Sequence, residues 1–257
     1  MKKTIPFAAL ALAAALAMAQ TATRPASAPG SQPANSALKA SLRDKARHLE
    51  IIKQTQGKKC DVAFLGDSIT HWFDKDLWAK HYEPLGAGNF GSAGDRTGNL
   101  LWRITEGKEL EGQSPRVFVV MIGVNNLWGN GNTPEEIVEG VGAVVAALRA
   151  GFPQAKVLVL GVLPTDPDPQ AEIRRRVKAL NMGLSRLREG QSVRFLDFGP
   201  KMLAADGSIS KDIMKDGLHP TAKGYQVWLD NVNPVLWDML GLPASQAATR
   251  RSQLEKD

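Results

Sequence analysis

Cysteine is nearly absent from this chain of 257 residues, which contains Cys60 and no other. A single cysteine cannot form an internal disulfide or supply the several thiolates of a structural zinc site. Because Cys60 lies directly before an apolar segment, we interpret it as a buried structural thiol. The sequence also lacks the Gly-Lys-Ser/Thr motif of a phosphate-binding loop. We therefore expect neither a thiolate metal site nor a nucleotide-binding loop of that kind.

Long hydrophobic runs are also missing, and no apolar segment is long enough to cross a membrane comfortably. The longest, residues 5–16, follows two lysines and precedes small residues at positions 17 and 19, which is the pattern of a secretory signal peptide. We expect residues 1–19 to be this signal, and the mature protein to be periplasmic or secreted without stable membrane insertion. Residues 20–36, rich in Ala, Ser, Thr and Pro, predict a disordered linker.

Positive charge exceeds negative charge only mildly. The formal net charge is +6, and it falls to +4 (6 − 2) if the two lysines near the N-terminus leave with the signal peptide. The basic residues are spread along the chain, and no nucleic-acid-reading motif accompanies them. We therefore expect no nucleic acid partner, and the oligomeric state is left open.

Apolar segments that end at glycine or polar residues alternate with segments of helical periodicity. Strands are predicted over residues 62–66, 87–90, 117–122, 157–160 and 193–196, and helices over 37–56, 70–80, 95–104, 133–150, 168–187 and 221–240. Continuous apolar strands that alternate with helices indicate a parallel sheet covered on both faces. We predict one three-layer α/β domain over residues 37–240 with a five-stranded parallel sheet, followed by a polar tail over 241–257.

Polar residues gather where the predicted strands end, and ligands of parallel sheets bind at that edge. Ser68 follows the first strand, Gly94 the second and Asn125 the third, while Asp216 and His219 lie in the long loop after the fifth. Ser68 stands between a strand and a helix, where free N–H groups favour an anion. The alternative interpretation is that Asp67-Ser68 only caps the helix, since both residues are common caps.

These residue types match the needs of ester hydrolysis, which requires a nucleophile, a base, a residue that orients the base, and donors for the oxyanion. Ser68 can attack, His219 can take its proton, and Asp216 can hold the other ring nitrogen of His219. The oxyanion donors would be the backbone N–H groups of Ser68 and Gly94 and the side-chain amide of Asn125. The three other histidines are interpreted as solvated or packed, because only His219 has a nearby acid on the correct rim: His48, His71 and His81.

Two motifs argue for other folds but lack the required context. Residues 86–91 spell G-x-G-x-x-G, yet they enter a strand, whereas a dinucleotide site needs the pattern to open a helix. The G-x-S-x-G elbow of the larger α/β-hydrolases is incomplete, because Thr70 stands where its second glycine would be.

The sequence resembles the SGNH hydrolase, or GDSL esterase, superfamily, whose four blocks occur here in order. They are Gly66-Asp67-Ser68, then Gly94, then Gly123-Val124-Asn125-Asn126, then Asp216-Gly217-Leu218-His219. The text around the second and third blocks looks closest to the branch of platelet-activating-factor acetylhydrolase catalytic subunits. That resemblance implies an SGNH, flavodoxin-like fold and hydrolysis of short acyl esters without metal or cofactor. The chain departs from the family with Ile69 after the nucleophile and Asn126 after the oxyanion asparagine.

We predict an exported serine esterase that acts on short acyl esters, with acetyl groups on carbohydrates or small lipids as the favoured substrates. Trp72, Trp128 and Leu163 follow strand ends and are candidates for the substrate pocket, although tryptophans are often core residues. Two alternatives stay open: a thioesterase or lysophospholipase of the same fold, and a non-catalytic carbohydrate-binding module.

The predicted signal peptide has a direct test. Expressed in a bacterial host with its full leader, the protein should be recovered outside the cytoplasm with an N-terminus near residue 20, because a signal peptidase removes residues 1–19. N-terminal sequencing measures this. A mature protein that begins at Met1 would contradict the prediction of export.

Overall fold

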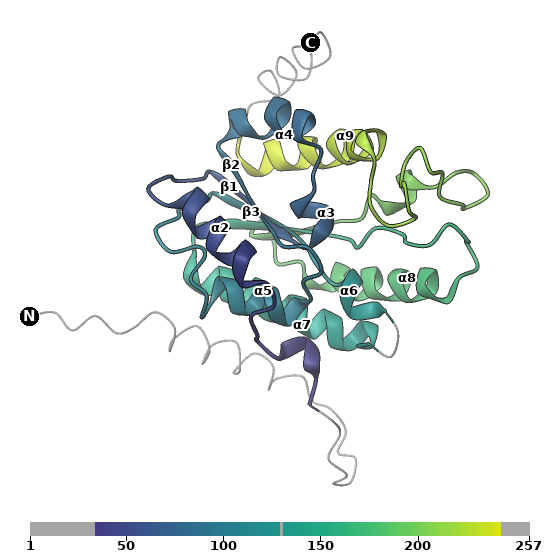
Figure 1. Ribbon diagram of the computed structural model, residues 1–257, viewed down its shortest axis with the longest axis horizontal. Coiled ribbons are helices and arrows are strands. Elements are labelled where there is room, and N and C mark those ends of the chain that lie inside the picture. The colour runs from purple at the N-terminus through teal and green to yellow at the C-terminus, as the bar shows by residue number, and fades with distance from the viewer. Residues whose placement is uncertain (1–33, 129–130, 243–257) are drawn as a thin grey trace, which may run out of the picture.

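The computed structural model describes residues 34–128 and 131–242, which form an α/β domain around one sheet (Figure 1). All strands of this sheet run parallel, in the order β2-β1-β3-β4-β5. The strands are β1 (Val62–Gly66), β2 (Ala87–Gly91), β3 (Val117–Met121), β4 (Lys156–Leu160) and β5 (Val193–Leu196). The predicted fold class is therefore confirmed. The signal peptide predicted over residues 1–19 lies outside the described residues, as do most of the predicted linker and tail.

Helices cover both faces of the sheet. In Figure 1, α4 and α9 lie above it, and α2, α5, α7 and α8 lie below it. The longer helices are α2 (Lys45–Thr55), α4 (Lys75–His81), α5 (Thr97–Ile104), α7 (Pro134–Gly151), α8 (Glu172–Leu184) and α9 (Ala222–Met239). Single turns follow two of the central strands as α3 (Ser68–His71) and α6 (Val124–Leu127), and 3-10 turns occur as η1 (Ser36–Leu38), η2 (Glu83–Leu85), η3 (Ser185–Leu187) and η4 (Gly199–Met202).

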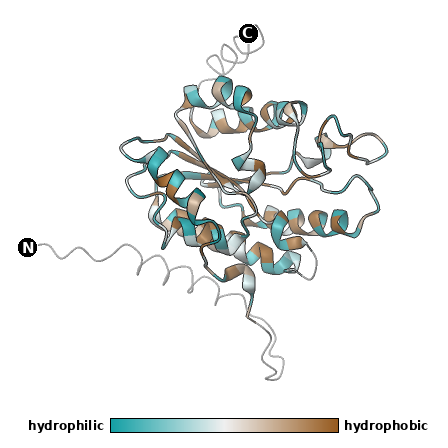
Figure 2. Ribbon diagram, viewed as in Figure 1, coloured by the Kyte–Doolittle hydropathy of each residue, from teal (hydrophilic) through white to brown (hydrophobic). Residues whose placement is uncertain are grey.

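Helices bury both faces of the sheet, and successive side chains of a strand point to opposite faces. Neighbouring residues of one strand therefore enter different cores. In β1, Ala63 and Leu65 join the core below the sheet, whereas Val62 and Phe64 join the core above it. Figure 2 shows the apolar residues concentrated in the strands and on the inward faces of the helices. This two-sided burial explains why the strands read as continuous apolar runs.

The helix predicted over residues 37–56 begins later than expected. The structure has the turn η1, an irregular stretch, and then α2 from Lys45. Asp44 caps α2, since its side chain accepts a hydrogen bond from the Arg47 N–H at 2.9 Å. A capping residue has non-helical backbone angles, so the helix cannot extend backwards through Asp44.

The single helix predicted over residues 70–80 is two helices, α3 and α4. Asp74 starts the second one by accepting a hydrogen bond from the Leu77 N–H at 3.0 Å, and Phe73 is buried between the two. Because α3 is only one turn long, the helix dipole expected at Ser68 is small. The unpaired N–H groups of a first turn remain.

The helix predicted over residues 168–187 begins at Glu172. Two successive side-chain turns precede it: the Asp168 N–H donates to the Asp166 carboxylate, and the Gln170 N–H donates to the Asp168 carboxylate. Such turns compete with helix formation. The resulting loop runs along the carboxyl edge of the sheet and meets the segment that carries His219.

No helix among the described residues is both long and apolar enough to span a bilayer.

Candidate active site

Ser68 is the first residue of α3, directly beyond the end of β1. The chain turns sharply there because Gly66 has no side chain: a Cβ at this position would lie 2.3 Å from the Thr70 hydroxyl and 2.5 Å from the Met121 carbonyl oxygen. Asp67 supplies the helix cap, since its side chain accepts a hydrogen bond from the Ile69 N–H at 3.0 Å. Capping is therefore done by Asp67, and the Ser68 hydroxyl has a different partner.

That partner is His219, which comes from the loop before α9. The Ser68 Oγ lies 2.9 Å from the His219 Nε2, and the His219 Nδ1 lies 2.7 Å from the Asp216 Oδ2. The other oxygen of Asp216 accepts hydrogen bonds from the backbone N–H groups of Leu218 and His219, at 3.0 and 2.7 Å. The structure thus brings serine, histidine and aspartate into one continuous hydrogen-bonded row.

The Asp216 carboxylate is held in its charged form. Partial burial acts to raise its pKa, but the hydrogen bonds from the backbone and ring of His219 and from the Leu218 N–H outweigh burial and lower the pKa to about 2. A charged Asp216 accepts a hydrogen bond from the His219 Nδ1–H, so the proton stays on Nδ1 and the Nε2 lone pair is left free for the Ser68 hydroxyl.

The loop after β4 is hydrogen-bonded to the segment that carries Asp216 and His219. Both the Asp166 N–H and the Thr165 hydroxyl donate to the Gly217 carbonyl oxygen, at 2.9 and 3.1 Å. Gly217 has a φ of +77°, and a Cβ there would lie 2.7 Å from Pro167. This close approach requires glycine between Asp216 and His219.

The predicted oxyanion donors come from the ends of three neighbouring strands. Gly94 follows β2 with a φ of +78°, and Asn125 lies in α6 after β3. The Asn125 side-chain amide donates to the Asp95 carbonyl oxygen at 3.0 Å, which ties these two loops together. Among the described residues, the Gly94 N–H donates to no protein acceptor, so it is available to a ligand.

The three candidate pocket residues have different environments. The indole of Trp72 is 54 % exposed, and its ring centroid lies 5.1 Å from that of His219. Trp128, the residue directly after α6, is 43 % exposed. Leu163 is 1 % exposed and packs in the core above the sheet. Two aromatic surfaces are thus open to solvent, and the leucine is not.

Arg103 is a component of this edge that the sequence analysis did not single out. Its guanidinium is buried and donates to the Gly66 and Phe90 carbonyl oxygens, and it also pairs with Asp95 at 2.7 Å and with Glu109 at 2.6 Å. Arg103 therefore links the ends of β1 and β2 to the loop after Gly94. Its position in the sequence could have indicated burial, because Arg103 follows Leu100 by three residues and so lies on the same inner face of α5.

The other three histidines, all within the described ranges, make no hydrogen bond to Ser68. His48 is buried and contacts the Glu109 carboxylate at 2.9 Å, so it belongs to the Arg103 network. The His71 Nδ1 accepts a hydrogen bond from the Ala93 N–H at 3.3 Å, and His81 lies at the end of α4. Of the four histidines, His219 is the one whose ring contacts Ser68.

Asp67, beside the predicted nucleophile Ser68, has a raised pKa. Complete burial, and to a lesser extent the nearby charge of Asp95, raise the pKa of its carboxyl to about 7. Burial also raises the pKa of Asp95, against the lowering effect of its pair with Arg103. Asp67 is thus largely neutral in mildly acidic solution, which suits its role in shaping the loop.

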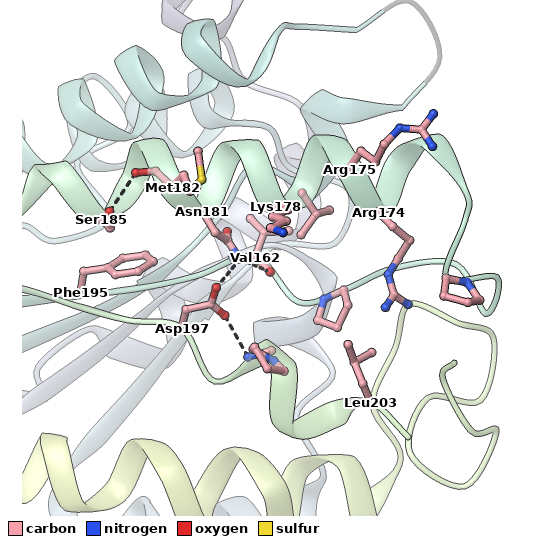
Figure 3. Close-up of a pocket in the computed structure, with 15 residues that line it drawn as sticks. Val162, Arg174, Arg175, Lys178, Asn181, Met182, Ser185, Phe195, Asp197 and Leu203 are labelled. Carbon is pink, nitrogen blue, oxygen red and sulfur yellow. Dashed lines mark hydrogen bonds between the residues drawn. The ribbon is translucent and has the colours of Figure 1, made fainter. Parts of the chain in front are cut away.

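A cavity of about 550 Å³ lies away from this row, between α8, β5 and η4 (Figure 3). Figure 3 shows Asn181 and Asp197 hydrogen-bonded to each other near its centre, with Arg174 toward one end. None of Ser68, Asp216 and His219 lines it. The cavity therefore is not the space in front of the Ser68 hydroxyl.

Comparison with known proteins places the chain in a defined group. The family model of the GDSL-like Lipase/Acylhydrolase family matches residues 64–227. Platelet-activating factor acetylhydrolase IB subunit alpha2 of Gallus gallus is 36 % identical over 181 residues, which cover 70 % of this chain and 77 % of that protein. The alpha1 subunit of Homo sapiens is 34 % identical over 204 residues, covering 78 % and 86 %.

Solved structures share the fold at lower sequence identity. A GDSL-like lipase from Bacteroides thetaiotaomicron superposes with a TM-score of 0.59 at 20 % identity, covering 79 % of this chain and 94 % of that one. A catalytic variant of an acetylxylan esterase from Geobacillus stearothermophilus gives a TM-score of 0.56 at 17 % identity, covering 73 % and 95 %.

The raised pKa of Asp67 predicts a pH dependence of stability. The folded state binds this proton more tightly than the unfolded chain, whose aspartate pKa is about 4. The free energy of unfolding contributed by Asp67 is therefore fully present below about pH 4 and is lost as pH rises through about 7. Asp67→Asn keeps an oxygen that can accept from Ile69 but removes the titration.

Urea unfolding from pH 4 to 8 measures the effect as the difference between wild type and Asp67→Asn. We expect wild type to lose stability relative to the variant across pH 4–7. Asp206→Asn, at an exposed carboxylate away from the site, is the matched control. Parallel pH curves for wild type and Asp67→Asn would show that Asp67 does not titrate in this window.

Proposed function

The chain belongs to the GDSL-like lipase/acylhydrolase family and is a carboxylic ester hydrolase, and we propose that Ser68, His219 and Asp216 are its catalytic triad. The observation that carries the proposal is the row of contacts from the Ser68 Oγ to His219 at 2.9 Å and on to Asp216 at 2.7 Å. This is the geometry in which an imidazole can take the proton of a serine hydroxyl.

The first half-reaction forms an acyl-enzyme. The Ser68 Oγ attacks the ester carbonyl carbon while its proton passes to the His219 Nε2, and Asp216 stabilises the resulting imidazolium. The carbonyl oxygen becomes an oxyanion that accepts hydrogen bonds from the Ser68 N–H, the Gly94 N–H and the Asn125 amide. The C–O bond to the alcohol then breaks, and His219 returns the proton to the departing alcohol.

The second half-reaction releases the acid. Water attacks the acyl carbon of Ser68, and His219 accepts a proton from that water. Collapse of the second tetrahedral intermediate breaks the bond to the Ser68 Oγ, which takes the proton back from His219. The products are the free carboxylic acid and the regenerated enzyme, and no step requires a metal or another cofactor.

Short acyl groups, acetyl above all, on carbohydrates or small lipids are the substrates that we propose. The names of the relatives support acetyl transfer to water: platelet-activating factor acetylhydrolase for the curated proteins and acetylxylan esterase for a structural neighbour. Trp72 supports a carbohydrate leaving group, because an exposed indole beside His219 offers a flat apolar face against which a sugar ring can pack. We also propose export, on the signal-like pattern of residues 1–19.

Two substitutions test the triad. Ser68→Ala should abolish hydrolysis of p-nitrophenyl acetate without unfolding the protein, because it removes only the nucleophilic oxygen. Asp216→Asn should lower kcat by up to about 10⁴-fold, since an amide nitrogen facing the Nδ1 favours the wrong tautomer of His219. Ser210→Ala, on an exposed turn of the preceding loop, is the control. Wild-type turnover in Ser68→Ala would refute the serine mechanism.

A substrate panel tests the proposed specificity and separates it from the alternatives. We expect kcat/KM to fall from acetyl to octanoyl p-nitrophenyl esters, and acetylated xylan to release acetate. Trp72→Ala should raise KM for the acetylated sugar more than for p-nitrophenyl acetate, with Trp78→Ala as a tryptophan control in α4. Faster turnover of acyl thioesters or lysophospholipids would favour those rival functions, and binding of glycans without turnover would favour a non-catalytic module.

A further inference from the structure

The peptide group between Ala93 and Gly94 is part of the proposed oxyanion site. It follows β2, and its N–H belongs to Gly94, the second proposed oxyanion donor. A loop peptide must point in a fixed direction if its N–H is to stabilise charge in the transition state without reorganising. A residue that fixes the orientation of this peptide would therefore contribute to oxyanion stabilisation.

Arg43 contacts this peptide from the segment before α2. Its Nη1 donates to the Ala93 carbonyl oxygen at 2.5 Å. A trans peptide is planar, with its C=O and N–H pointing in opposite directions. A guanidinium that holds the Ala93 C=O on one side therefore aims the Gly94 N–H toward the other side.

Gly94 makes room for this contact. A Cβ on Gly94 would lie 2.5 Å from the Arg43 Nη2, 2.6 Å from its Cζ and 3.0 Å from its Nη1. The guanidinium thus occupies the position that a side chain would take, next to a backbone with a φ of +78°. Glycine at this position serves both the conformation and the approach of the arginine.

The same loop is held on its other side by different groups. The Ala93 N–H donates to the His71 Nδ1 at 3.3 Å, and the Asn125 amide donates to the Asp95 carbonyl oxygen at 3.0 Å. Arg43 supplies the hold on the Ala93 carbonyl. Among the described residues, Arg43 forms no salt bridge, but its charge acts on the nearby Asp95 carboxyl and helps to lower the pKa of that group against the effect of burial.

We propose that Arg43 is a positioning residue that orients and polarises the Ala93–Gly94 peptide for oxyanion stabilisation. The inference rests on the proposed function of Gly94 as an oxyanion donor. Arg43 lies before residues 64–227, the part of the chain that matches the family model. The N-terminal segment thus completes the site in addition to covering the sheet.

The first experiment measures kcat and KM of Arg43→Ala with p-nitrophenyl acetate. We expect kcat to fall about tenfold or more with KM changed less than twofold, a loss smaller than the 10²–10³-fold seen when an oxyanion donor is deleted. Lys45→Ala is the matched control, because it removes a cation two residues away that has no contact with the loop. Thermal unfolding of both variants checks that they fold alike.

Chemical rescue supplies a readout that a merely structural residue would not give. Ethylguanidinium at tens of millimolar should restore part of the kcat of Arg43→Ala and leave wild type and Lys45→Ala unchanged. Arg43→Lys should lie between wild type and the alanine variant, because an ammonium keeps the charge but not the planar fork. Arg43→Lys also serves as the test variant if the alanine variant folds poorly.

Three results would overturn the proposal: a kcat of Arg43→Ala within twofold of wild type, a loss that appears in KM alone, or a loss that ethylguanidinium does not relieve. The failure of the proposed function has a different signature, since Ser68→Ala would then keep its activity. Loss of activity in Ser68→Ala together with full activity in Arg43→Ala would reject Arg43 and retain the triad.

Discussion

The hydrogen bonds of the buried Arg103 guanidinium are the interactions that hold the proposed catalytic edge together. It reaches the carbonyl oxygen at the end of β1, a carbonyl oxygen of β2, and the carboxylate of Asp95 in the loop after Gly94. These segments carry the proposed nucleophile and one of the proposed oxyanion donors. A single planar group with several donors can fix them together because its hydrogen bonds diverge in fixed directions. Glu109 and His48 extend the network to α2.

Burying charge in this way is costly unless each ion is paired, so the network also constrains its neighbours. Asp95 and Glu109 face Arg103, which leaves Asp67 close to a second carboxylate in a fully buried position. The protonated form of Asp67 avoids an uncompensated charge there. Electrostatics and shape thus act together: burial raises the pKa of Asp67, which caps α3, while hydrogen bonds lower the pKa of Asp216, at the exposed end of the proposed triad.

The cavity lined by α8, β5 and η4 is separate from the row formed by Ser68, His219 and Asp216. The cavity beside α8 and β5 is lined by apolar, basic and other polar side chains, Asn181 and Asp197 among them, whereas the proposed triad lies on an edge flanked by the exposed indole of Trp72. The order of strands produces this edge, since β1 and β3 are central and their carboxyl ends carry Ser68 and Asn125.

The sequence by itself determined the alternation of strands and helices, the parallel sheet, the strand ends that Ser68, Gly94 and Asn125 follow, and the position of His219 in the long loop after β5. Periodicity and glycine positions suffice for this because they follow from local geometry. The tertiary structure decided the rest: where α2 begins, the break between α3 and α4, the burial of Leu163, and the roles of Arg103 and Arg43. These features depend on contacts between residues that are far apart in the sequence. Arg43 lies 51 positions before Gly94 (94 − 43), and no local sequence pattern predicts its contact with the loop there.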